Sequence, residues 1–222
     1  MGSSPKSFLP LLGTLALVSS SSNAHADTLA ATYGDSLHER SHTVIAERRG
    51  DDVAFRVRRE IHNSGKRVEE AELEIRLPLQ AVTTSLRTKQ GTQWLPGRLV
   101  PTAEALGVYE HFTGSGPLAS NGPALLAWDD LGAQILRVFP IAANTTITVE
   151  YEFLAPTCYH GGKRIAFYPK TEDAKALPAA RIRIAGNRGG RVVSQGASLS
   201  AKAKESVETC TLDASGGELA VV

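Results

Sequence analysis

The sequence predicts an all-β protein: an antiparallel β-sandwich with one short helix, followed by a smaller β-unit. Residues 145–153, TTITVEYEF, alternate apolar and polar side chains as a half-buried strand does. Short apolar runs recur along the chain, separated by Gly, Pro, Asn and Ser turn signals at roughly 8–12-residue spacing. A single stretch, residues 102–112, has helical periodicity instead.

The N-terminal 26 residues have the organisation of a secretory signal peptide. Lys6 precedes an apolar run from Phe8 to Val18, and Ala24-His25-Ala26 is a small-x-small cleavage pattern. The apolar run is shorter than the roughly 20 residues of a membrane-spanning helix. We therefore expect a mature chain from Asp27 that is exported to a bacterial periplasm or beyond, with no membrane span after signal removal.

The balance of charged residues restricts the kinds of partner that the protein can bind. The chain has 24 Lys and Arg against 23 Asp and Glu, a net charge of +1, which argues against a nucleic-acid partner. The length suits one or two domains. We expect a sandwich domain over residues 27–175 and a small C-terminal β-unit over residues 176–222.

The first strands of the sandwich follow from alternation in residues 53–61 and 73–79. The turn signal Asn63-Ser64-Gly65-Lys66 lies between them, so the pattern predicts an antiparallel hairpin. Charged residues on its solvent face are then explained by cross-strand ion pairs rather than by a ligand. The expected pairs are Arg56 with Glu74 and Arg58 with Glu72.

The helix is predicted to begin at Thr102, a good N-cap residue after Pro101, and to stop at Gly114. Ala105, Val108, Tyr109 and Phe112 recur at helical spacing, which predicts a helix that covers an open end of the sandwich. The glycine-rich loop from Thr113 to Pro123 follows. As an alternative role, the helix Thr102 to Phe112 and the loop Thr113 to Pro123 form a candidate interaction surface, because exposed aromatic residues beside a glycine-rich loop are typical of binding sites. Its aromatic residues are Tyr109, Phe112 and Trp128.

The other predicted strands are short. The segment 134–141 is expected to pair with the strand 146–153. Further strands are expected at residues 82–87, 94–100, 123–128, 164–168, 181–185, 191–194, 207–212 and 218–222.

A set of motifs follows in a fixed order along the chain: Asn63, Glu70, Leu77-Pro78-Leu79, Gly97, Ala105, Tyr109-Glu110, Pro123-Ala124-Leu125-Leu126, Leu136-Arg137-Val138-Phe139-Pro140-Ile141 and Val149-Glu150-Tyr151. Over about residues 40–170, their order and spacing resemble the VIT (vault protein inter-alpha-trypsin) domain family. The sequence departs from the family pattern in a longer loop before PALL, in Trp128-Asp129-Asp130, and in Ala142-Ala143-Asn144 in place of a Pro-Gly turn.

The resemblance implies a non-catalytic interaction or scaffolding module that acts in extracellular adhesion or assembly. It implies a protein partner, no catalytic residues and no cofactor. Residues 178–222 resemble the β-unit that leads into a von Willebrand type A domain in longer family members. Asp213-Ala214-Ser215-Gly216-Gly217 lacks the last serine of that domain's metal signature, so we expect no metal there.

One string points to an alternative function. His38-Glu39-Arg40-Ser41-His42 matches H-E-x-x-H, which on a helix presents two zinc ligands and a general base. The alternative is a zinc-dependent hydrolase that uses His38, Glu39 and His42. The β-branched residues at 43–45 favour a strand instead. A folding remnant without a function of its own is a third alternative.

Cys158 and Cys210 are the two cysteines of the chain. In an exported protein they are candidates for a disulfide, with two buried free thiols as the alternative.

Overall fold

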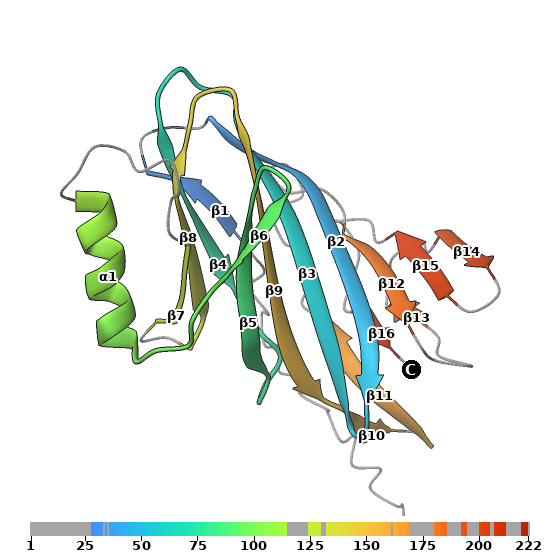
Figure 1. Cartoon of the computed structure of the whole chain (residues 1–222). Coiled ribbons are helices and arrows are strands. Elements are labelled where there is room, and N and C mark those ends of the chain that lie inside the picture. The colour runs from blue at the N-terminus through green and yellow to red at the C-terminus, as the bar shows by residue number, and fades with distance from the viewer. Residues whose placement is uncertain are drawn as a thin grey trace, which may run out of the picture.

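The computed structural model describes residues 28–32, 34, 36–114, 124–129, 132–160, 162–168, 180–185, 192–194, 200–204, 207–211 and 219–221. The predicted signal peptide and residues 115–123 of the predicted loop lie outside this part of the chain. What is described is mostly β-structure with one helix, arranged as packed, largely antiparallel sheets (Figure 1). The predicted fold class is therefore confirmed. Within the described residues, no helix has the length and apolarity needed to cross a bilayer.

The largest sheet has eight strands, and its neighbours are antiparallel except for β12 and β2, which are parallel. Two long strands, β2 and β3, form its centre together with β9. In spatial order the strands are β14 (Ser200–Lys204), β15 (Val207–Thr211), β12 (Arg181–Ala185), β2 (Leu37–Arg49), β3 (Asp52–Asn63), β9 (Thr146–Pro156), β5 (Val82–Gln90) and β6 (Gln93–Pro96).

Two four-stranded sheets complete the structure. One has the order β1 (Thr28–Ala31), β4 (Glu69–Ile75), β8 (Gln134–Ile141) and β7 (Ala124–Trp128), and helix α1 (Thr102–Gly114) lies beside it in Figure 1. The other has the order β10 (Cys158–His160), β11 (Lys163–Tyr168), β16 (Leu219–Val221) and β13 (Val192–Ser194). The pairing of β12 with β2 and of β16 with β11 joins C-terminal strands to the sheets of the N-terminal region.

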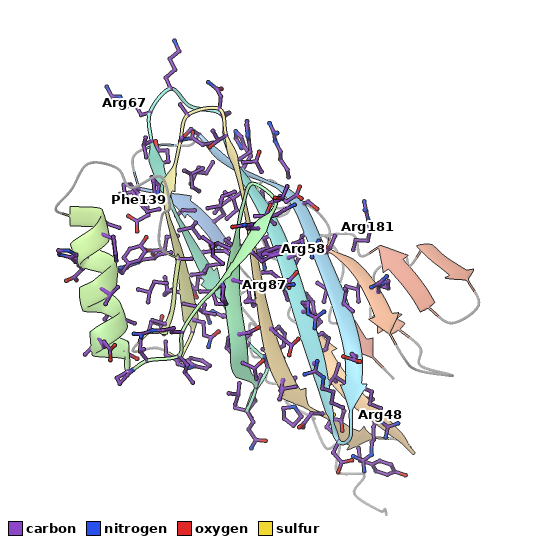
Figure 2. The ribbon with its side chains drawn as sticks, viewed as in Figure 1. Arg48, Arg58, Arg67, Arg87, Phe139 and Arg181 are labelled. Carbon is purple, nitrogen blue, oxygen red and sulfur yellow. The ribbon has the colours of Figure 1, made fainter. Side chains whose placement is uncertain are left out.

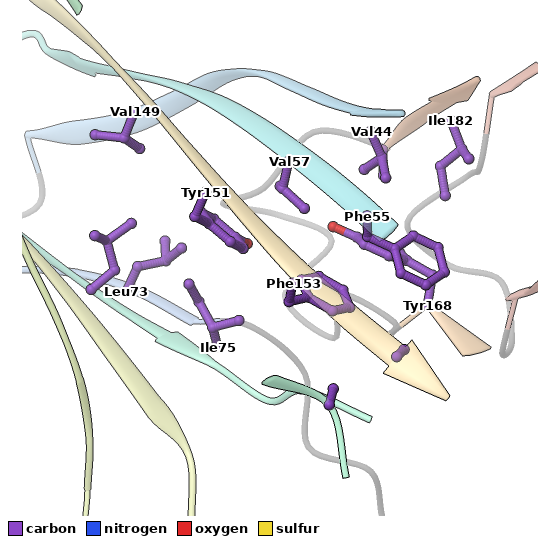
Figure 3. Packing of buried hydrophobic residues seen from close by; sticks show 14 of the residues in the cluster. Val44, Phe55, Val57, Leu73, Ile75, Val149, Tyr151, Phe153, Tyr168 and Ile182 are labelled. Carbon is purple, nitrogen blue, oxygen red and sulfur yellow. The ribbon is translucent and has the colours of Figure 1, made fainter. Parts of the chain in front are cut away.

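The core lies on the inner face of the eight-stranded sheet. Alternate residues of its central strands point there, so Phe55 on β3 stacks on Phe153 of β9 with ring centroids 5.0 Å apart. Tyr168 of β11 packs against both rings, and Leu73 and Ile75 of β4 belong to the same cluster (Figure 3). Both smaller sheets therefore contribute side chains to one continuous core.

The predicted hairpin of residues 53–61 with 73–79 is wrong. Strand β3 pairs with β2 and β9, whereas β4 pairs with β1 and β8 in another sheet. The expected pairing of 134–141 with 146–153 is wrong for the same reason, because β8 and β9 belong to different sheets. Alternation identifies a strand with one buried face, but both sheets of a sandwich present such faces.

The segment between β3 and β4 is a crossover between sheets, held by the buried side chain of Asn63. Its amide donates to the carbonyl groups of Arg67 at 2.7 Å and Ile141 at 2.9 Å, and its oxygen accepts from the N–H of Gly65 at 2.8 Å. A Cβ atom on Gly65 would lie 2.9 Å from Cβ of Ser36. The turn signal in the sequence thus marks a tight sheet-to-sheet connection.

Candidate interaction surface

The H-E-x-x-H string lies on strand β2 rather than on a helix. The register of β2 against β3 shifts between Glu39 and Ser41, so Arg40 is an extra residue, a β-bulge. The bulge lets Glu39 and His42 both face the core, although residues three apart on a regular strand face opposite sides. His38 faces solvent, where its Nε2 forms a 3.1 Å hydrogen bond with Oγ of Ser64. The strand does not bring His38 together with Glu39 and His42.

Glu39 and His42 belong to a buried polar cluster with Arg59, Tyr151 and Tyr168. Nη1 of Arg59 donates to Oε2 of Glu39 at 3.0 Å, and neither side chain is exposed. Nε of Arg59 donates to the hydroxyl of Tyr151 at 3.2 Å. His42 Nε2 and the hydroxyl of Tyr168 share a hydrogen bond of 2.8 Å. The cluster links three strands, β2, β3 and β9, to β11.

Burial sets the protonation of this cluster. Loss of hydration acts to raise the pKa of the Glu39 carboxyl. The guanidinium of Arg59, 3.0 Å away, favours the ionised carboxylate, so the two groups form a buried ion pair. Loss of hydration lowers the pKa of His42 to about 4, so the imidazole is neutral at pH 7. Burial also raises the pKa values of Tyr151 and Tyr168.

The cluster has two polar atoms without a hydrogen-bond partner among the described residues, Oε1 of Glu39 and Nδ1 of His42. They lie 4.0 Å apart. Among the described residues, a metal ion here would have these two unpartnered atoms as ligands, and it would lie close to the positive guanidinium of Arg59. The described residues contain no group of three or more His, Cys, Asp or Glu side chains that could hold a metal. The geometry suits a core that is fixed by polar contacts.

The helix is anchored by a residue that sequence analysis placed on the candidate surface. Tyr109 is only 4% exposed, and its hydroxyl donates to Oε1 of Glu70 on β4 at 2.6 Å. Burial and this carboxylate raise the pKa of Tyr109. Its assignment to the interaction surface was therefore wrong, because the ring packs inward while its hydroxyl reaches a carboxylate on the neighbouring sheet.

The other two predicted surface residues are exposed. Phe112 is 50% exposed on α1, and Trp128 is 49% exposed at the end of β7. Val108, which the periodicity placed on the covered face of the helix, is also 48% exposed. The apolar stripe of α1 thus divides into an inner part at Tyr109 and an outer part at Val108 and Phe112.

Cys158 lies on β10, where it is exposed and forms no disulfide with a described side chain. Cys210 lies on β15, and its side chain is outside the described part of the structure. The bridge between them stays a prediction.

The arginines that the sequence paired with β4 have other partners. Arg58 donates through Nε and Nη2 to Oε2 of Glu150 on β9, at 3.0 and 2.8 Å, and Arg87 on β5 donates through Nε to Oε1 of the same carboxylate at 2.7 Å. Arg56 donates to Glu152 at 3.1 Å. The expected pairs with Glu72 and Glu74 are wrong. The alternating glutamates of TTITVEYEF were the signal that could have identified the true partners.

No family model and no curated protein matches the chain. Solved structures with a similar arrangement include a candidate nutrient-binding protein from Legionella pneumophila, at 9% identity and a TM-score of 0.48, with 89% of this chain and 71% of that chain covered. The M1 zinc metallopeptidase from Deinococcus radiodurans has 8% identity and a TM-score of 0.43, with 84% and 42% covered. Yeast LTA4 hydrolase has 11% identity and a TM-score of 0.47, with 91% and 31% covered. Likeness at this level identifies no family for the chain.

Proposed function

We propose that this chain is an exported, non-catalytic interaction module of VIT type, which acts in adhesion or assembly and binds a protein partner through the helix side of the sandwich. One observation carries the proposal. Tyr109 fixes α1 to β4 through Glu70, while Val108 and Phe112 on the same helix remain about half exposed. A rigidly held helix that presents apolar side chains loses little conformational freedom when a partner covers them.

The position of the H-E-x-x-H residues also supports a non-catalytic role. The side chains of Glu39 and His42 are sealed in the core, and the carboxylate of Glu39 is occupied by Arg59. A general base must reach the proton that it abstracts, and a zinc site needs ligands that converge. His38 lies on the solvent face of the same strand. These placements give the zinc hydrolase alternative no support.

Site-specific photocrosslinking in cells tests the helix-side contact. A photoreactive phenylalanine analogue at Phe112 is expected to capture one discrete protein in the extracytoplasmic fraction. Tyr159 is a matched control position, since it is an exposed aromatic residue on β10 in a different sheet. Equal capture at both positions, or none at Phe112, would contradict the proposed surface.

A second measurement connects the capture to these side chains. Phe112→Ala combined with Trp128→Ala is expected to abolish the crosslinked product formed from a probe at Val108, without changing the urea midpoint of the purified protein. A lower midpoint would show that the two aromatic residues belong to the core.

N-terminal sequencing of the exported chain tests the predicted start at Asp27.

A further inference from the structure

The outer face of the eight-stranded sheet carries an ordered array of arginines. The register aligns residues of five adjacent strands, β12, β2, β3, β9 and β5, in rows across the sheet. One row is Arg181, Thr43, Arg58, Glu150 and Arg87. The row beside it is Arg183, Ile45, Arg56, Glu152 and Ser85. The five arginines of these rows outnumber the two glutamates, although the whole chain has a net charge of only +1.

The arginines on β3 and β5 are held in place by their neighbours. Glu150, which is buried, accepts hydrogen bonds from both Arg58 and Arg87. The Trp94 ring on β6 lies against the same two guanidinium groups, with centroid distances of 5.1 Å to Arg58 and 4.4 Å to Arg87. Both guanidinium groups remain partly exposed and keep N–H donors that these contacts do not use.

In the described part of the chain, Arg181 and Arg183 on β12 lack the ion pairs that hold the arginines of β3 and β5. Both are exposed, and neither has an ion-pair partner within the described residues. Across β2 from them lie Arg58 and Arg56. Figure 2 shows Arg181 and Arg58 on opposite sides of β2.

Thr43 and Ile45, the short side chains of β2 between these two pairs of arginines, form what we call the arginine-flanked strip. The two flanks are two strand spacings apart, about 10 Å. Along each strand the two arginines are two residues apart, about 7 Å. Alternate side chains of an extended polypeptide repeat at the same distance of about 7 Å.

We propose that the arginine-flanked strip binds an extended acidic polypeptide segment with Asp or Glu at alternate positions, lying along β2. Each carboxylate of such a segment meets guanidinium groups from β12 and from β3. Guanidinium groups bind carboxylates in a planar, two-pronged geometry, which favours this occupant. The excess of positive charge in these two rows supplies the complementary charge.

A labelled peptide of alternating glutamate and threonine is the probe, with binding followed by fluorescence anisotropy on the purified mature chain. Its affinity is expected to fall as salt is added. A control peptide has the same composition with its glutamates in one block. The control is expected to bind at least about tenfold more weakly, because its carboxylates do not match the spacing of the arginines.

Two variants test the location of the site. Arg181→Gln with Arg183→Gln is expected to weaken binding of the alternating peptide by about tenfold or more. Thr43→Glu, which places a negative charge in the strip, is expected to weaken it similarly and serves as an independent check. The matched control is Arg76→Gln with Arg98→Gln, which removes the same charge from residues that pair with Glu74 and Glu104 away from this face.

Three results would overturn the proposal. The first is equal binding of the alternating and block peptides, which would define an unspecific polyanion surface. The second is an equal effect of the control variant. The third is binding of a sulfated polysaccharide but not of the peptide. Phe112→Ala with Trp128→Ala is expected to leave peptide binding unchanged, so the outcome is independent of the helix-side contact.

Discussion

Arg59 and Glu39 form an ion pair of 3.0 Å in which neither side chain is exposed. The pair lies between sheets, and the hydroxyl of Tyr151 accepts a further hydrogen bond from Arg59. Removal of one partner from a buried ion pair leaves the other charge unpaired in the core, which lowers stability strongly. Replacement of both partners by apolar side chains lowers stability far less.

Arg59→Met is therefore expected to lower the free energy of unfolding by about 3–5 kcal/mol. Combining it with Glu39→Leu is expected to recover most of this loss. Urea denaturation of both variants and of the wild type gives the comparison. If the double variant is as unstable as Arg59→Met alone, the stabilising contact of Arg59 is not Glu39.

The neutral imidazole of His42 predicts a dependence of stability on pH. Its pKa is lowered from 6.5 to about 4 in the folded chain, so between these pH values the unfolded chain binds the additional proton. The free energy of unfolding thus falls as pH decreases from about 6.5 to 4, by about 3 kcal/mol from this group. Its contribution is fully present above pH 6.5.

The measurement is the pH profile of the urea midpoint for the wild type and for His42→Gln, which cannot titrate in this range. The difference between the profiles should have its slope between pH 6.5 and 4. A constant difference would contradict the buried, neutral state of His42. The groups that face it, Glu39 and Tyr168, are common to both proteins.

Tyr109 and Phe112 are expected to differ sharply although both are aromatic residues of α1. Tyr109→Ala should destabilise the fold by about 3 kcal/mol, because it leaves a cavity and removes the hydrogen bond to Glu70. Phe112→Ala should change stability by less than about 0.5 kcal/mol, because its ring is half exposed. Thermal unfolding of the two variants distinguishes them. Equal losses of stability would show that the ring of Phe112 packs in the core.

Glu150 neutralises part of the arginine array on the outer sheet face. Glu150→Gln is expected to lower the free energy of unfolding by about 1–2 kcal/mol. The loss is no larger because the arginines around Glu150 are partly exposed, and solvent weakens their ion pairs with it. Added salt should reduce this loss, since it screens the repulsion between Arg58 and Arg87. Unfolding at low and high salt provides the test, and Glu104→Gln on α1 is the control. A loss that does not depend on salt would point to packing instead.

Local periodicity places a strand in the sequence but does not select the strands beside it. The alternation in residues 53–61 and in TTITVEYEF located β3 and β9 correctly, because one buried face requires a period of two wherever the strand pairs. The same alternation gave the wrong partners for β3 and β4. Nothing local distinguishes the inner face of one sheet from that of the opposing sheet.

The residues of the candidate site also differ in how far the sequence could predict their roles. Phe112 and Trp128 are exposed as a surface role requires, whereas Tyr109 reaches Glu70, a residue 39 positions earlier in the chain. The arginine-flanked strip depends on β12 lying beside β2, a parallel pairing over more than 130 residues of sequence. Local periodicity predicts neither the contact of Tyr109 with Glu70 nor the pairing of β12 with β2.

The sequence by itself indicated the helix and most of the strands, because hydrophobic periodicity and turn residues act over a few positions. It did not indicate the short strands β1, β10 and β14. The tertiary structure alone decided which strands became neighbours and which charges met. The bulge at Arg40 is the clearest case, since one extra residue turns Glu39 and His42 to the same side and commits both to the core. Packing between the sheets then buries them, so that Glu39 pairs with Arg59 and His42 stays neutral at pH 7.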